Sequence, residues 1–320
     1  MKPLATTRTV GVDVSKLELE TFELETGTAV CIPNTIESIE LWLDRWESPI
    51  RLAIEPTNRY HQAVAQLAHA RGHQVYLIDP LRLAHYRQGV GQRVKADRQD
   101  AQLLARYLDR EVSELRLWQP ETPPQQRFWH LLKRRAALVR TRVQLRQSLT
   151  DLAALQAEVE SLLTQMDRLL RKMDQALMTE AKGLGWRAQV ERCRAVPGVG
   201  LLTALALVAL YQRGQFERAD AFIAFMGMDV RVRQSGQWRG RCKLTKQGDP
   251  EVRRLLFNAA MQGRRNPLWE PYYLSLRARG MSTTAAFVAL GRKLARVCFA
   301  LLKNGTDFNP HRRSGACAAT

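Results

Sequence analysis

Four carboxylates occupy positions from which they could bind metal ions together. Asp13 lies in a short β-branched run, and Glu55 ends the apolar run RLAIE. Asp97 and Asp100 stand three residues apart near an expected helix start, where they share a face and repel by about a few tenths of a kcal/mol or more. A hard divalent cation, Mg²⁺ or Mn²⁺ rather than zinc, would reverse that repulsion. Each carboxylate alone is better interpreted as a surface acid, with Asp97 as a helix cap, whereas the four together favour a metal site.

A second candidate for chemistry is the basic segment, residues 231–248, which contains Ser235-Gly236 and no acidic residue. Its glycines disfavour a long helix and allow close approach to a phosphate backbone. The segment is interpreted either as a solvated basic loop or as a contact for DNA or RNA, with Trp238 stacking on a base or packing between domains. Its basic residues are Arg231, Arg233, Arg239, Arg241, Lys243 and Lys246.

The overall charge favours a polyanionic partner. Lys and Arg number 49 against 31 Asp and Glu, a formal net charge of +18 over 320 residues, and such an excess is typical of nucleic-acid binding. No apolar run is long enough to cross a bilayer, and the first residues lack the apolar core of a signal peptide. The five cysteines are odd in number and scattered without CxxC spacing, which fits reduced thiols in the cytoplasm better than a disulfide framework or a zinc site.

The first 120 residues show an α/β pattern that would position the carboxylates. Strand-like runs alternate with two helical patterns, the second of which ends at Gly72, and a further apolar helix begins near Ala96. This order predicts a mixed sheet of RNase H-like type over residues 1–120. The expected strands are 7–14, 18–25, 28–33, 51–55 and 74–78.

Residues 121–182 predict a coiled coil or a helical hairpin. Neither glycine nor proline occurs between Gln125 and Lys182, and apolar residues recur every seven positions, among them Leu138, Leu145 and Leu152. The early part is basic, so it is interpreted either as a solvated face or as a nucleic-acid contact joined to an oligomerisation element. The basic residues proposed as contacts are Arg134, Arg135 and Arg142.

Residues 183–310 predict a helical domain that carries the basic segment. The turn Val196-Pro197-Gly198-Val199-Gly200 precedes the apolar helix Leu201–Tyr211 and is similar to the turn of helix-hairpin-helix modules, in which backbone N–H groups meet a phosphate. A plain turn is the alternative. Asp249-Pro250 is expected to start another helix, and residues 311–320 are expected to be disordered.

Five blocks together resemble a known family. They are VGVDVSK, IEPT, KADRQDAQLLARY, VPGVGLLTALAL and RQSGxxRGRxxLTKQGDPEVRRLL, in this order from near the N-terminus to about Arg265. They are similar to blocks of the DEDD transposases of bacterial insertion sequences, the IS110 family with its IS1111 subgroup. The chain departs from the family pattern at Pro56 and Asn58, where a small residue and a glycine are usual, and at Asp229-Val230, where a proline is common.

The resemblance implies a role for each candidate residue. A RuvC-like, RNase H-type domain would hold divalent metal through Asp13, Glu55, Asp97 and Asp100, and a C-terminal transposase domain would supply Ser235 as the nucleophile that forms a covalent serine–DNA link. It also implies a structured bridge RNA that pairs with target and donor DNA, in a bacterial protein that is nucleoid-associated when it acts.

A serine hydroxyl needs a base or a metal for activation, and no histidine lies near Ser235 in the sequence. Because the serine and the acids belong to different domains, we expect a composite site, with acids from one protomer and Ser235 from another in a dimer or tetramer. Two alternatives stay open: a RuvC-type junction nuclease in which water attacks, and a non-catalytic nucleic-acid-binding protein.

Overall fold

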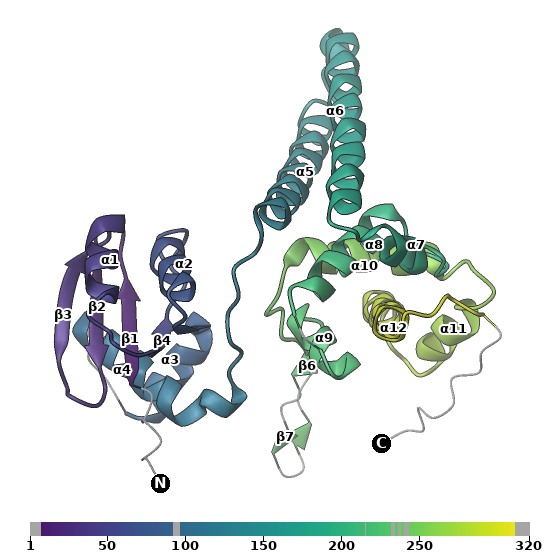
Figure 1. Ribbon diagram of the computed structural model, residues 1–320. Coiled ribbons are helices and arrows are strands. Elements are labelled where there is room, and N and C mark those ends of the chain that lie inside the picture. Colours follow the sequence, from purple (N-terminus) through teal and green to yellow (C-terminus); the bar gives the residue numbers. More distant parts are fainter. Residues whose placement is uncertain are drawn as a thin grey trace. The chain divides into compact units, whose positions relative to one another are not determined.

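The computed structural model describes residues 8–91, 97–214, 216–231, 234–235, 238–239 and 243–310, without the side chains of residues 97, 98, 234, 235, 238 and 239. The chain divides into two compact units, Met1–Pro120 and Glu121–Thr320 (Figure 1). Each unit has its own hydrophobic core, so each is described by itself.

The first unit is built on a five-stranded mixed sheet in the order β3-β2-β1-β4-β5. β1 pairs with β2 and β2 with β3 in antiparallel ladders, whereas β1, β4 and β5 run parallel. The alternating and β-branched runs of the sequence therefore form the mixed α/β sheet that they predict. The strands are β1 (Thr9–Val14), β2 (Glu18–Glu23), β3 (Ala29–Pro33), β4 (Arg51–Ile54) and β5 (Gln74–Leu77).

Helices cover both faces of this sheet. Val12, Leu52 and Val75 belong to the cluster formed with α1 (Ile36–Leu43) and α2 (Gln62–Ala70). On the other face, Ala53 and Tyr76 pack against α3 (Pro80–Gly89) and α4 (Asp97–Glu111). A one-turn 3₁₀ helix, Val112–Glu114, follows α4. The two faces thus have distinct cores, and the candidate acids lie on the α4 side, as described below.

Helix α3 is an element that the sequence pattern did not reveal. It begins at the N-cap Asp79, whose Oδ1 accepts hydrogen bonds from the N–H groups of Leu81 and Arg82 at 2.9 and 3.0 Å. Only Leu83 of this helix is buried. A helix with one buried side chain has no apolar period for a pattern search to detect.

Residues 123–183 form a helical hairpin, one of the two forms that the heptads predicted. α5 (Pro123–Ser148) starts with a capping box made by Thr122 and Gln125, and α6 (Gln156–Gly183) returns alongside it (Figure 1). Residues 149–155 connect the two helices and include the 3₁₀ turn Ala153–Leu155. Leu152, which continues the heptad pattern, therefore lies in the turn with 45% of its surface exposed.

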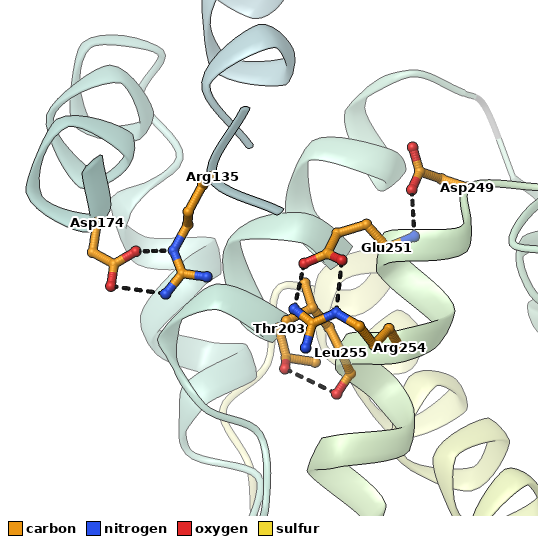
Figure 2. Close-up of polar contacts among 7 residues, drawn as sticks. All are labelled: Arg135, Asp174, Thr203, Asp249, Glu251, Arg254 and Leu255. Atoms are coloured by element: carbon orange, nitrogen blue, oxygen red, sulfur yellow. Dashed lines mark hydrogen bonds and ion pairs between the residues drawn. The ribbon is translucent and has the colours of Figure 1, made fainter. Parts of the chain in front are cut away.

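Ion pairs join the two helices of the hairpin. The Arg142 Nη2–Asp167 Oδ2 distance is 2.7 Å, and Arg135 forms a two-point pair with Asp174 (Figure 2). The hydrogen bond from Arg142 lowers the pKa of Asp167. Two of the three arginines proposed as nucleic-acid contacts thus hold the hairpin together, while Arg134 is exposed.

The base of the hairpin belongs to the core of the second unit. Phe128, Trp129 and Leu177 are buried in the same cluster as α8, all of whose residues from Thr203 to Leu210 are buried. A nearly continuous apolar run predicted this buried helix correctly. The helices after the hairpin are α7 (Arg187–Arg194), α8 (Leu201–Gln212), α9 (Ala219–Phe225), α10 (Pro250–Gly263), α11 (Glu270–Ala278) and α12 (Thr283–Asn304).

The turn between α7 and α8 packs tightly against α10. Gly198 has φ +91°, and a Cβ added there would lie 2.7 Å from the carbonyl oxygen of Ala259. The indole N–H of Trp269 donates to the Pro197 carbonyl at 2.9 Å. The turn is therefore fixed by packing, and its likeness to a helix-hairpin-helix phosphate site stays a prediction. Residues 311–320, expected to be disordered, lie outside the described residues.

None of the helices in the described ranges is both long and apolar enough to cross a membrane.

His73 predicts a pH dependence of stability in the first unit. Its Nδ1 accepts a hydrogen bond from the Ile50 N–H at 3.2 Å, and burial, with a further contribution from Arg71, lowers its pKa below 6.5. The unfolded chain therefore binds more protons than the folded one near pH 6, so the free energy of unfolding falls as the pH drops below about 6.5 toward the folded-state pKa.

His73→Asn keeps an acceptor near the Nδ1 position but does not titrate, so we expect it to flatten the pH dependence of urea midpoints between about pH 7 and 5. His61, whose pKa burial also lowers, should contribute to the slope that remains. Equal slopes for the wild type and the variant would contradict this assignment.

Candidate active site

Asp13 and Glu55 lie on neighbouring parallel strands at matching positions. The β1–β4 ladder pairs Gly11 with Ala53 and Val12 with Ile54, so Asp13 and Glu55 stand one register step beyond its last pair. Neighbouring strands are about 4.8 Å apart, and side chains two residues apart point to the same face. Both carboxylates therefore belong to the face of Gly11 and Ala53, and both are partly exposed.

Helix α4 approaches that face at Gly11. A Cβ on Gly11 would lie 1.9 Å from the Ala101 carbonyl oxygen and 2.6 Å from the Ala105 nitrogen, so only glycine admits the helix at this distance. Ala101 directly follows Asp100, and Asp13 is two residues beyond Gly11. The contact therefore places the first turn of α4, to which Asp97 and Asp100 belong, against Gly11, two residues before Asp13.

Asp100 is buried and neutralised by an arginine. Its side chain is 6% exposed, and the Arg87 Nη2 of α3 lies 2.7 Å from its Oδ1. The Asp13 Oδ1 accepts a hydrogen bond from the Val14 N–H at 3.0 Å. Among the described residues no three His, Cys, Asp or Glu side chains converge as a metal site, and the side chain of Asp97 lies outside that description. Asp13 and Glu55 are thus brought together by register, and Asp100 is held by Arg87.

The chain after Glu55 retains a glycine-like backbone without the glycine. Asn58 has φ +48°, the left-handed region that asparagine tolerates better than other non-glycine residues. The departure from the family pattern at this position therefore keeps the conformation that the usual glycine allows.

Ser235 lies in the second unit, on a hairpin of short strands. We call residues 229–245 the serine hairpin. β6 (Val230–Arg231) pairs with β9 (Lys243–Leu244), and β7 (Gln234–Ser235) pairs with β8 (Trp238–Arg239), with Ser235 opposite Trp238. Only two residues of sequence lie between Ser235 and its partner Trp238. Ser235 is therefore at the end of the β7–β8 ladder that is nearest to the connection between these two strands.

The basic residues of the segment are described only in part. Arg231, Lys243 and Lys246 are exposed, as a contact to phosphate requires. The side chain of Arg239 is outside the described part of the chain, as are Arg233 and Arg241. Exposure is compatible with both interpretations of the segment, a solvated loop and a nucleic-acid contact.

Sequence reasoning missed two residues of the acidic site, Gly11 and Arg87. Gly11 had a signal, because a glycine inside the strand pattern VGVDV is typical of a close backbone approach. Arg87 had none, since its partner Asp100 is thirteen residues away across a helix that was not predicted.

Comparisons with known proteins identify the family. A DEDD transposase model of the IS110 type matches residues 10–157, and a model described as transposase IS116/IS110/IS902 family matches residues 190–274. The two matches cover the acidic site and the serine hairpin in turn. The chain belongs to the IS110 family of transposases.

Relatives of this IS110 transposase align over most of its length. It is 27% identical to the pilin gene-inverting protein of Moraxella lacunata over 282 residues, which are 85% of this chain and 86% of the relative. The protein of the same name from Moraxella bovis is 28% identical over the same length. The transposase for insertion sequence element IS1111A of Coxiella burnetii is 28% identical over 250 residues, 65% of this chain and 66% of the relative.

The Gly11 contact predicts a severe effect of a single methyl group. Because the Cβ of Gly11→Ala would meet backbone atoms of Ala101 and Ala105, α4 must shift away from β1, and we expect a loss of about 3 kcal/mol or more in the free energy of unfolding. Gly89→Ala is the matched control, since a Cβ there meets nothing within 4 Å. Denaturant titrations would contradict the contact if both variants changed stability by less than about 0.5 kcal/mol.

Proposed function

We propose that this transposase cuts and rejoins DNA at a composite site, under the guidance of an RNA, through a covalent serine–DNA intermediate. The observation that carries the proposal is the placement of Asp13 and Glu55 at one register step, on the face where α4 approaches Gly11. The strand order β3-β2-β1-β4-β5 supports an RNase H-like, RuvC-like first unit, the architecture that the family resemblance implies.

The acidic residues suit a divalent cation. Asp13, Glu55, Asp97 and Asp100 offer only carboxylate oxygens, the ligands that Mg²⁺ and Mn²⁺ prefer. Bound Mg²⁺ would supply Lewis-acid stabilisation of charge that develops on the scissile phosphate. In its absence Arg87 provides the positive charge that buried Asp100 requires.

Ser235 supplies the nucleophile in this proposal. Its Oγ bonds to phosphorus as the bond from phosphorus to a deoxyribose oxygen breaks, the serine proton leaves, and the departing oxygen is protonated. Reversal with a new deoxyribose hydroxyl rejoins the DNA and frees the serine. Exposed Arg231 and Lys243, which pair with each other in the β6–β9 ladder of the serine hairpin, would hold phosphates by charge-assisted hydrogen bonds.

The remaining parts follow the family resemblance. A structured bridge RNA and the target and donor DNAs would bind to the basic surfaces, which include exposed Arg134 of the helical hairpin. Residues 121–182 would associate protomers into a dimer or tetramer, residues 183–310 would act as the serine-bearing domain, and the Pro197–Gly200 turn would contact phosphate as a helix-hairpin-helix element does.

A relative's activity favours rejoining over simple cleavage. The Moraxella proteins are named for inverting a gene, and inversion requires that cut ends be joined again. A junction nuclease that uses water would cut without joining. For this reason recombination is preferred to the nuclease alternative and to a non-catalytic role.

Substitution of the serine tests the proposal in bacterial cells that carry the complete insertion element. Rapid denaturing lysis should recover DNA covalently attached to the wild-type chain, whereas Ser235→Ala should lose the attachment by at least about a hundredfold, as expected for removal of a nucleophile. Strand breaks that survive Ser235→Ala would instead identify the nuclease, and their absence with the wild type would favour a binding protein.

Co-expression of two variants in the same assay tests whether the acids and the serine of one site come from different protomers. Co-expression of Ser235→Ala with Asp13→Ala chains should restore attachment if each site combines acids and serine from different protomers. Lack of complementation, with both chains present at equal amounts, would assign the acids and the serine to one chain.

The ion pair between Arg87 and Asp100 predicts that metal binding affects the thermal stability of an Arg87 variant. Arg87→Gln leaves buried Asp100 without its cation, which should cost about 3 kcal/mol in metal-free buffer. If the acids bind Mn²⁺, added Mn²⁺ should raise the melting temperature of this variant more than that of the wild type. The matched control is Arg82→Gln, an exposed arginine of the same helix. Equal Mn²⁺ shifts in all three proteins would argue against a metal at Asp100.

A further inference from the structure

The two chain segments that lead into and out of the serine hairpin, which we call its legs, contact each other closely where they join the helical core. We call residues 226–229 and 245–248 the hairpin root. The Thr245 N–H donates to the Asp229 carbonyl and the Lys246 N–H to the Gly227 carbonyl, each at 3.1 Å. The Thr245 hydroxyl also donates to the Asp229 Oδ1. Backbone and side-chain bonds thus join the legs at the point where they leave the helical core.

Two glycines allow the legs to touch. A Cβ on Gly227, which has φ +66°, would lie 2.6 Å from the Gln247 nitrogen, and a Cβ on Gly248 would lie 2.3 Å from the Met226 carbonyl carbon. Any larger residue at either position would force the legs apart. The root therefore depends on backbone-to-backbone packing.

Arg253 of α10 bonds to both legs at once. Its Nη1 donates to the Gly248 carbonyl at 2.7 Å and to the Met226 carbonyl at 3.2 Å. The guanidinium is partly buried, and burial lowers its pKa, although arginine stays charged at neutral pH. Charge-assisted hydrogen bonds of this kind are stronger and more directional than those between neutral groups.

Helix α10 is a rigid support for that guanidinium. Its N-cap Asp249 accepts from the Glu251 N–H at 2.8 Å, and the Thr203 hydroxyl of α8 donates to the Leu255 carbonyl at 3.4 Å (Figure 2). Val252 and Leu256 are fully buried. Because α10 is fixed in the core of the second unit, the bonds from its Arg253 hold the hairpin root in a defined position relative to that core.

The described strands of the serine hairpin are short. Its four strands are two residues long, and an isolated two-stranded ribbon is marginally stable in water. A small rotation at the root is magnified at Ser235, and a misplacement of about 1 Å can cost roughly a hundredfold in rate. The orientation of the serine thus depends on the root.

We propose that Arg253 is a positioning residue for Ser235, which it orients by pinning both legs of the serine hairpin to α10. This inference rests on the proposed role of Ser235 as nucleophile. Arg253 acts through the Met226 and Gly248 carbonyls, so its loss should disturb the hairpin and the chemistry while leaving the helical core and its nucleic-acid surfaces in place.

Arg253→Met and Arg254→Met form the matched pair that tests the proposal. Arg254 is the next residue of α10 and pairs with Glu251 through Nε–Oε2 and Nη2–Oε1 distances of 2.7 and 2.5 Å (Figure 2). Both variants lose a partly buried arginine, but only Arg253→Met loses bonds to the hairpin root. Hydrogen exchange of the full chain reads the root directly at the Thr245 and Lys246 amides.

For Arg253→Met we expect exchange at these amides to accelerate at least about tenfold, as local opening requires. Covalent attachment of DNA in element-carrying cells should fall at least about tenfold as well, while crosslinking of DNA and RNA to the chain stays within about threefold of the wild type. Arg253→Lys, which can donate to one carbonyl, should recover part of the attachment. Arg254→Met should leave root exchange unchanged, whatever it does to the melting temperature.

Unchanged root exchange in Arg253→Met, or attachment that falls with melting temperature equally in both methionine variants, would overturn the proposal. The exchange measurement does not depend on Ser235. If cleavage survives Ser235→Ala while Arg253→Met still loosens the root, the proposed nucleophile is wrong; if Ser235 is required and root exchange does not change, the positioning role of Arg253 is wrong.

Discussion

The first unit depends on one close approach between backbones. Gly11 lets α4 lie against β1 so closely that a single methyl group would overlap the Ala101 carbonyl. The parallel pairing of β1 with β4 fixes Asp13 beside Glu55, and the Gly11 contact adds the first turn of α4 to them. The elements that carry Asp13, Glu55 and Asp100 are therefore positioned by main-chain contacts, which side-chain rearrangement cannot easily disturb.

Glycines also allow close contact between backbones in the second unit. Gly227 and Gly248 bring the legs of the serine hairpin into backbone contact, and Arg253 joins both legs to α10. The strands beyond this root are too short to be rigid alone. The direction in which this hairpin leaves the core is therefore set at the root, where Arg253 contacts both legs.

The sequence predicted the elements whose residues are apolar in recognisable runs. The five strands follow from short β-branched or alternating runs, and the buried helix α8 follows from a nearly continuous apolar run. Helix α3 was missed because Leu83 is its only buried residue. The heptads did not locate the turn between α5 and α6, because Leu152 keeps the seven-residue spacing although it lies outside the helices. Spacing also gave no role to Ser235, which only the family resemblance marked as a nucleophile.

The net charge of +18 is not all available to a nucleic acid. Arg87 neutralises Asp100, Arg135 and Arg142 bind acids of α6, and Arg253 binds backbone carbonyls. A count of charges assigns all of these to the same basic surface, because pairing across helices and turns is invisible in a linear sequence. Among the described residues, the cations that remain exposed include Lys133, Arg134 and Arg140 of α5. They occupy the solvent side of a helix whose Arg127, Arg135 and Arg142 pair with acids of α6, so one helix combines structural ion pairing with a surface suited to phosphate.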